Sequence, residues 1–303
     1  MGYRSFRAAA ACALALGLLP ALAHAQTPSP ALPPPPTAPQ AIKEVKPGLF
    51  MVTGGGGNTT VRVTSAGLVV VDGKNPGQNF YDDLMGQIRT VSPQPVKWLV
   101  DTHHHADHSG NNGRFLAAGA KVVAQRGLPA ELDKFVPPPT NPTLTSPAKP
   151  DVTYDTRYAI SLGGKTVQLM HFAPAHTGSD TIVYFPDLKV VAMGDELNAA
   201  NPNFDYGAGA SVAGWVSSID QTLKLDWDKA VPGHGAEPFT REQVKVFRDK
   251  LQTLLDRARE QVKAGTPKDK FVASLKTDDL WTFPANFWNA MRTDGLYAEA
   301  GGK

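Results

Sequence analysis

The pattern of apolar and polar residues predicts two β-rich halves, in each of which strands are followed by helices. In the first half, short β-branched runs predict strands over Leu49–Thr53, Thr59–Thr64, Leu68–Asp72, Val96–Asp101 and Lys121–Ala124. The second half repeats this pattern, with strands predicted over Lys165–Phe172, Thr181–Phe185, Val190–Met193 and Lys229–Val231. The chain therefore belongs to the α/β class, and two sheets packed together with helices outside them are expected.

Apolar residues at helical spacing predict the helices. The predicted helices cover Phe80–Thr90, Gly113–Ala118, Val212–Leu223 and Arg241–Lys263. The last of these is strongly amphipathic, and Gly265 and Pro267 are expected to end it. A proline-rich stretch, Val136–Pro150, separates the two halves, and its length favours a lid or a binding loop over a simple connection.

The first 25 residues have the features of a signal peptide. Arg4 and Arg7 precede an apolar run of 15 residues, and Ala23-His24-Ala25 gives the small-x-small pattern that signal peptidase requires. An N-terminal membrane anchor is the alternative, but the run is shorter than the ~20 residues that a membrane span needs. We therefore expect cleavage after Ala25 and a periplasmic or secreted protein without stable membrane insertion.

Residues 26–41 are predicted to be a linker. Seven prolines lie between Thr27 and Gln40, with almost no large apolar side chain among them. This composition favours an extended, polyproline-like chain over packed structure. A single domain is therefore predicted over residues 42–303.

Composition and charge exclude some classes of protein. Apolar residues make up 42% of the 303 residues, which is enough for a substantial core. The net charge of +2 comes from Arg4 and Arg7 alone, so the mature chain lacks the basic excess of nucleic-acid-binding proteins. The only cysteine, Cys12, lies within the predicted signal peptide. Any metal site of the mature protein must therefore consist of His, Asp and Glu.

Candidate metal ligands are concentrated directly after the predicted strand Val96–Asp101. The sequence there reads Thr102-His103-His104-His105-Ala106-Asp107-His108. His103 and His105 alternate with His104 and are expected to project to one side of the turn, while Asp107 and His108 point in a second direction. Imidazoles and carboxylates are the ligands that zinc prefers. One loop is thus predicted to serve two neighbouring metal ions, and His104 is expected to bind neither.

Three more candidates follow later strands, where loops of α/β proteins carry function. They are His176, Asp195 and His234. Asp195 has the alternative role of bracing its loop, and a surface tract of metal-scavenging histidines is an alternative for the cluster as a whole. Such tracts lack both a preceding strand and partners downstream. His171 lies within a predicted strand and is expected to be structural.

The motif His103-x-His105-x-Asp107-His108, followed in order by the three later residues, resembles that of the metallo-β-lactamase superfamily. The resemblance covers essentially the whole mature domain. It implies an αβ/βα sandwich of two mixed β-sheets with helices on the outer faces and a metal site along the sheet edges. It also implies a ligand set: His103, His105 and His176 on one metal, Asp107, His108 and His234 on the other, and Asp195 bridging, as in the glyoxalase-II-like branch.

The resemblance implies an exported dinuclear zinc hydrolase. A metal-bound hydroxide would attack the carbonyl of a small ester, thioester, lactone or amide, and Asp107 would orient it or carry its proton. Lactamases with a cysteine ligand are excluded, whereas a β-lactamase of the third subclass type stays compatible. A mononuclear iron oxidoreductase like the persulfide dioxygenases and a non-catalytic binding protein are two further candidates. The candidate pocket walls are Trp215, Phe204, Tyr206 and the Val136–Pro150 loop, and ordinary packing is their alternative role.

Overall fold

The computed structural model describes residues 1–2, 38–137, 139 and 141–302. Apart from its first two residues, the predicted signal peptide lies outside the described residues, and so does residue range 26–37 of the predicted linker. The first strand begins at Ala41, one residue before the predicted domain boundary. In the described part of the chain, no helix combines the length and the apolar composition that are needed to cross a bilayer.

The first sheet has seven strands, which lie side by side in the order of the chain. They are β1 (Ala41–Lys46), β2 (Leu49–Thr53), β3 (Thr59–Thr64), β4 (Gly67–Val71), β5 (Val96–Val100), β6 (Lys121–Gln125) and β7 (Val152–Tyr154). Strands β1 to β4 are antiparallel, whereas β4 to β7 are parallel. The sheet is therefore mixed, and the parallel strands end at the same edge.

The second sheet has six strands in the order β13-β12-β11-β10-β9-β8. They are β8 (Arg157–Leu162), β9 (Lys165–Met170), β10 (Ile182–Phe185), β11 (Val190–Ala192), β12 (Lys229–Val231) and β13 (Phe239–Thr240). Only β11 and β12 are parallel, so this sheet is mixed as well.

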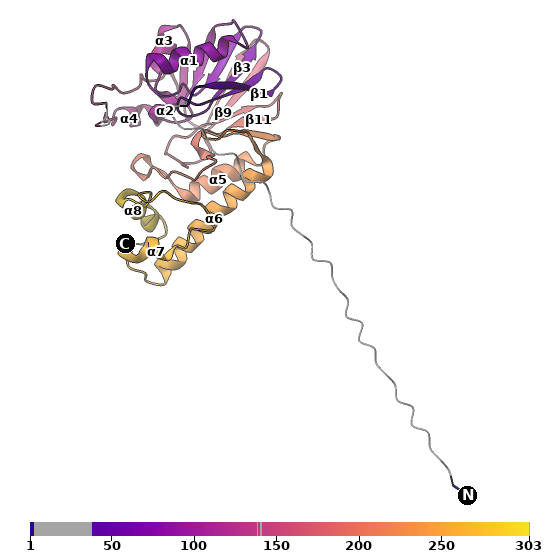
Figure 1. Cartoon of the computed structure of the whole chain (residues 1–303), viewed down its shortest axis with the longest axis vertical. Coiled ribbons are helices and arrows are strands. Elements are labelled where there is room, and N and C mark those ends of the chain that lie inside the picture. The colour runs from indigo at the N-terminus through magenta and orange to yellow at the C-terminus, as the bar shows by residue number, and fades with distance from the viewer. Residues whose placement is uncertain (3–37, 138, 140, 303) are drawn as a thin grey trace.

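Helices lie on the outer faces of the two sheets, and the C-terminal helices pack on the long helix beside the second sheet (Figure 1). They are α1 (Gln78–Arg89), α2 (Ala106–Ser109), α3 (Asn112–Ala117), α4 (Leu128–Leu132), α5 (Val212–Thr222), α6 (Arg241–Lys263), α7 (Lys268–Ser274) and α8 (Ala290–Glu299), with 3₁₀ turns η1 (Gly194–Glu196) and η2 (Tyr206–Ala208). The long helix α6 begins with a capping box between Thr240 and Gln243.

Strand β4 shows how the layers are held together. Val69 and Val71 join the core between the two sheets, whereas Leu68 and Val70 join the core beneath α1. Alternate side chains of a strand point to opposite faces, so a strand that is apolar throughout is buried on both faces. A third core, around Trp215, lies between the second sheet and the C-terminal helices. The helix–sheet–sheet–helix arrangement predicted from the sequence is thus confirmed.

Elements that the pattern did not predict are short or half exposed. Both ends of each predicted strand and helix lie within two residues of the observed ends. Strands β7 and β13 have three and two residues, too few to show a period. Strand β8 lies at the edge of its sheet, and only Ile160 in it is buried. Gly295 interrupts the apolar pattern of α8.

Candidate metal centre

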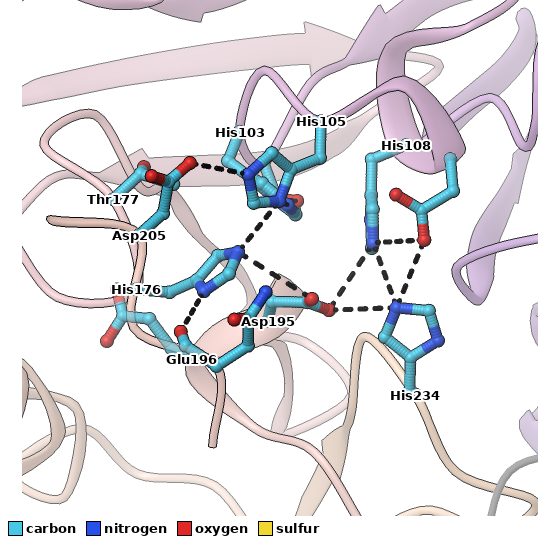
Figure 2. A network of polar contacts seen from close by, with 12 residues as sticks. His103, His105, His108, His176, Thr177, Asp195, Glu196, Asp205 and His234 are labelled. Carbon is cyan, nitrogen blue, oxygen red and sulfur yellow. Dashed lines mark hydrogen bonds and ion pairs between the residues drawn. The ribbon is translucent and has the colours of Figure 1, made fainter. Parts of the chain in front are cut away.

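The seven predicted ligands come together because the segments that carry them follow strands that end at one edge of the sandwich. The turn after β5 carries His103 and His105, and the short helix α2 that follows carries Asp107 and His108. His176 follows β9, Asp195 lies in η1 after β11, and His234 follows β12. Figure 2 shows the five histidines gathered in two neighbouring groups, and Asp107 belongs to the group of His108 and His234.

The first group consists of three imidazoles whose inner nitrogens converge. Nδ1 of His105 lies 3.1 Å from Nε2 of His103 and 3.0 Å from Nε2 of His176. The rings of His103 and His176 are fully buried, and that of His105 is partly exposed. These inner nitrogens can therefore all reach one point.

The outer nitrogens of the same rings contact acceptors, which assigns their tautomers. Nδ1 of His103 lies 3.1 Å from Oγ1 of Thr102, and Nε2 of His105 lies 2.9 Å from Oδ2 of Asp205. Nδ1 of His176 lies 2.6 Å from the carbonyl oxygen of Asn203. Each outer nitrogen donates its proton to such an acceptor, so each inner nitrogen carries a lone pair. Three lone pairs then face one another at about hydrogen-bond distance with no proton between them. A cation bound between the three lone pairs would satisfy all of them. Outer hydrogen bonds orient metal-binding histidines in the same way.

The second group has two imidazoles and a carboxylate. Oδ2 of Asp107 lies 3.2 Å from Nε2 of His234 and 3.6 Å from Nε2 of His108. Nδ1 of His108 donates to Oδ2 of Asp72 at 2.8 Å, so its Nε2 is the nitrogen that faces the centre. The side chain of Asp107 is 32% exposed, so this group opens towards solvent.

Asp195 lies between the two groups (Figure 2). Its Oδ1 is 3.3 Å from Nε2 of both His108 and His234, and its Oδ2 is 3.7 Å from Nε2 of His176. Oδ1 is buried and makes no hydrogen bond within the described part of the chain. Each oxygen therefore faces one group, which is the placement that a bridging carboxylate requires.

The electrostatics of the two groups differ. Burial and the neighbouring imidazoles lower the pKa of His103 well below its usual range and that of His176 to about 4, so these two rings are neutral. Burial acts in the same direction on His108 and His234, but the two carboxylates of the centre outweigh it. They raise the pKa of His108 well above its usual range and that of His234 to about 9. A cation in the second group would replace these protons.

The donor set fits metal ions. Neutral imidazoles and carboxylates with convergent lone pairs suit zinc and similar cations, and ligand atoms within each group lie within 4.8 Å of one another. Proteins of the metallo-β-lactamase superfamily bind metal ions, typically zinc, and the residues present could hold one ion in each group. The prediction that these seven residues are ligands stays a prediction.

Asp72 is a site residue that sequence reasoning missed. Its side chain is almost completely buried and accepts hydrogen bonds from the backbone N–H and the hydroxyl of Thr102, both at 2.8 Å, besides that from His108. It therefore orients a ring of the second group and holds the turn that carries the first. The signal was present in the sequence, since Asp72 follows a wholly apolar strand just as Asp195 does.

Two glycines allow the backbone to approach the centre closely, and neither was predicted. A Cβ atom on Gly57, in the turn between β2 and β3, would overlap the imidazole of His108. A Cβ atom on Gly233 would overlap the carboxylate of Asp195. The glycines of these turns therefore leave the space that the ligands occupy.

Two of the residues predicted as pocket walls are core residues in the structure. Trp215 and Phe204 are fully buried in the core around α5, so their predicted alternative, ordinary packing, is correct. Nε1 of Trp215 donates to the carbonyl oxygen of Glu196. Tyr206 is partly buried and donates its hydroxyl hydrogen to Glu299. In the Val136–Pro150 loop, residues 138 and 140 lie outside the described residues, and Asn141 and residues 143–148 line a separate depression.

A cavity of about 320 Å³ opens beside the first group. The residues that line it include His104, His105, Leu132, Phe135 and Asp205. Its size falls in the usual range of small-molecule sites. Nε2 of His104 lies 3.8 Å from Oδ2 of Asp205. Nδ1 of His171 donates to the carbonyl oxygen of Asp180 at 2.8 Å, and His171 belongs to neither ligand group.

Three known proteins show similarity along the sequence. The α subunit of a 2,4-dinitroanisole O-demethylase from Nocardioides sp. (strain JS1661) is 27% identical over 150 residues, 46% of this chain and 41% of that one. A linear primary-alkylsulfatase from Pseudomonas sp. (strain ATCC 19151) is 22% identical over 262 residues, 69% of this chain and 48% of that one. Metallo-β-lactamase IND-1 from Chryseobacterium indologenes is 28% identical over 183 residues, 58% of this chain and 71% of that one. The chain thus spans less than half the length of the first two.

Solved structures share the fold. A metallo-β-lactamase from Pontibacter korlensis superposes with a TM-score of 0.61 at 21% identity, over 70% of this chain and 99% of that one. The stereoselective inverting sec-alkylsulfatase Pisa1 from Pseudomonas sp. gives 0.67 at 20% identity, over 86% of this chain and 50% of that one. The sequence model of the metallo-β-lactamase superfamily matches residues 46–234, more than half of the chain and the whole span of the predicted ligands. The chain therefore belongs to the metallo-β-lactamase superfamily, as the histidine motif indicated.

Proposed function

We propose that this protein is an exported, dinuclear zinc hydrolase that cleaves a small ester, thioester, lactone or amide. The observation that carries the proposal is the pair of convergent ligand groups with Asp195 between them. A mononuclear iron oxidoreductase would need only the first group, and the second set of ligands argues against it. Two zinc ions, when bound, polarise the scissile bond and lower the pKa of a bound water.

The residues of the chain supply orientation and proton transfer. Asp72 and Asp205 hold the rings of His108 and His105 so that their lone pairs face inward. Asp107 is the partly exposed carboxylate of the centre, so it would hold an ion through one oxygen and would orient the attacking water or take its proton through the other. The adjoining cavity would take the rest of the substrate.

A panel of substrates tests the proposed reaction. We expect the purified, zinc-loaded protein to hydrolyse at least one of esters, lactones, thioesters and β-lactams, and to lose that activity in excess chelator. β-Lactams form the second candidate class, because a relative and a structural neighbour are metallo-β-lactamases. Alkyl sulfates and phosphodiesters are the contrasting arms of the panel. Turnover of these alone would contradict attack on a carbonyl.

The metal content follows from the two groups. We expect two zinc ions per chain, measured by elemental analysis after dialysis. His176→Ala is expected to lower mainly the occupancy of the first group, and His234→Ala mainly that of the second, because each removes one of its ligands. Full metal content and activity in both variants would refute the ligand assignment.

Export predicts the N-terminus of the mature protein. We expect material recovered from the periplasm or the medium to begin at Gln26, because the small-x-small pattern precedes it. Intact-mass spectrometry measures this directly. Exported protein that still carried Met1 would contradict the prediction.

A further inference from the structure

The segment Asn203–Tyr206 contacts two of the three imidazoles of the first group from outside. The carbonyl oxygen of Asn203 accepts from Nδ1 of His176 at 2.6 Å, and Oδ2 of Asp205 lies 2.9 Å from Nε2 of His105. The backbone N–H of Asp205 also donates to the carbonyl oxygen of His176 at 3.1 Å. This short segment therefore sets the direction of both inward lone pairs.

The other side chains of the segment are held by the C-terminal part of the chain. Nη2 of Arg292 donates to Oδ1 of Asn203 at 2.6 Å. The ring of Phe204 packs on Phe287 and Trp288, with centroid distances of 5.9 and 6.2 Å. Three of the four residues thus turn towards the C-terminal segment or away from the centre, whereas Asp205 faces His105.

Glu299, in the last turn of α8, is the main anchor. Its carboxylate accepts from the hydroxyl of Tyr206 at 2.7 Å, from Oγ of Ser211 at 2.8 Å and from the backbone N–H groups of Val212 and Ala213 at 3.0 and 2.8 Å. These N–H groups belong to the free N-terminus of α5, where a negative charge is favourable.

Helix α8 also fits the segment closely. A Cβ atom on Gly295 would overlap the ring of Tyr206, so the absence of a side chain there lets the ring lie against the helix. Gly295 thus has a packing role that explains a glycine within a helix, where it otherwise costs stability.

We propose that α8 is a positioning element of the metal centre, acting through Asn203–Tyr206 on His105 and His176. Helix α8 lies beyond residue 234, where the match to the superfamily ends, so this contact belongs to the part of the chain that the superfamily model does not cover. The inference rests on the proposed function, because it takes the three imidazoles to hold a metal ion.

Asp205 carries the effect to the imidazole. One of its oxygens faces His105, and the other accepts from the backbone N–H of Ala208 at 3.2 Å. An asparagine has a single oxygen and loses one of these contacts, and it also removes the charge that makes the ring a stronger ligand. Removal of such an outer partner typically weakens metal binding about 10–100-fold.

The test compares Asp205→Asn, Glu299→Gln and the control Asp294→Asn in the full-length mature protein. Asp294 lies on α8 as well, but it forms a surface ion pair with Lys268. Zinc affinity is measured for the tighter and the weaker site by competition with a chelator. The melting temperature of the metal-free protein is measured in parallel, and His176→Ala identifies which site is the first group.

We expect Asp205→Asn to weaken zinc binding at the first group by roughly 10–100-fold and Glu299→Gln by roughly 2–30-fold. The second group should change less than the first, and Asp294→Asn should match the wild type. Unchanged zinc affinity in Glu299→Gln, whatever Asp205→Asn does, would overturn the inference. So would an equal loss at both groups together with a lower melting temperature, because α8 would then only stabilise the fold. If the wild type bound no zinc at all, the proposed function would fail first.

Discussion

Asp107→Asn is expected to lower kcat by roughly 10²–10⁴-fold, even when both ligand groups are saturated with zinc. The substitution keeps the shape and one oxygen ligand, but it removes the negative charge and the ability to accept a proton. Oδ2 of Asp107 lies 3.2 Å from Nε2 of His234, and a third of the side chain is exposed towards solvent. Among the seven candidate ligands, this position combines contact with the centre and access for a water.

Saturation with zinc separates the two roles of the carboxylate. If Asp107 served only metal affinity, excess zinc would restore most of the turnover. The comparison is His104→Ala, which we expect to cost less than about ten-fold, because its ring borders the cavity and belongs to neither of the two groups that hold the centre. Near wild-type kcat of Asp107→Asn in excess zinc would therefore leave this residue a purely structural role.

The gathering of the seven candidate ligands could be predicted from the sequence because each of them follows a predicted strand. Loops that follow the strands of an α/β sheet lie together at one edge of the sheet. Two β-rich halves with helices predicted two packed sheets, and in the structure strand β4 is apolar and buried on both faces, as such a sheet requires. Fold and family followed from these features, and both are confirmed.

The residues that hydrogen-bond to the candidate ligands from outside could not be predicted from the sequence in the same way. Asp205 lies 100 residues from His105 along the chain, in an irregular segment with no strand before it. Glu299 acts on that segment from the last turn of a helix that the pattern did not predict. Hydrogen bonds over such separations depend on tertiary packing, and a single sequence holds no periodic signal for them.

Aromatic residues near the site were ambiguous for a related reason. Trp215 lies on a predicted helix that borders the centre, and its ring centroid is 6.0 Å from that of His176. A position close to the candidate ligand His176 is therefore compatible both with a pocket wall and with ordinary core packing. Its complete burial against α6 decides for packing, a property of the three-dimensional contact and not of the residue type.

Gly57→Ala is expected to empty the second group and to abolish turnover. The φ angle of Gly57 lies outside the left-handed region, so alanine can adopt the backbone conformation and the substitution tests space alone. The new Cβ atom would overlap the imidazole of His108, which Asp72 holds from the other side at 2.8 Å. Because the ring is fully buried, it cannot swing aside without breaking that bond. Overpacking of this kind typically costs about 1–3 kcal/mol of unfolding free energy.

Gly86→Ala is the matched control for that variant. Gly86 lies in α1, and a Cβ atom there would meet nothing within 4 Å, so alanine should stabilise the helix by roughly 0.5–1 kcal/mol. Metal content, kcat and chemical denaturation are measured for both variants. We expect Gly86→Ala to keep two zinc ions and wild-type turnover, whereas Gly57→Ala should keep only the ion of the first group, since the atoms nearest to the new Cβ atom all belong to His108 of the second group. A Gly57→Ala protein with both ions and full activity would show that His108 is not held where the geometry puts it.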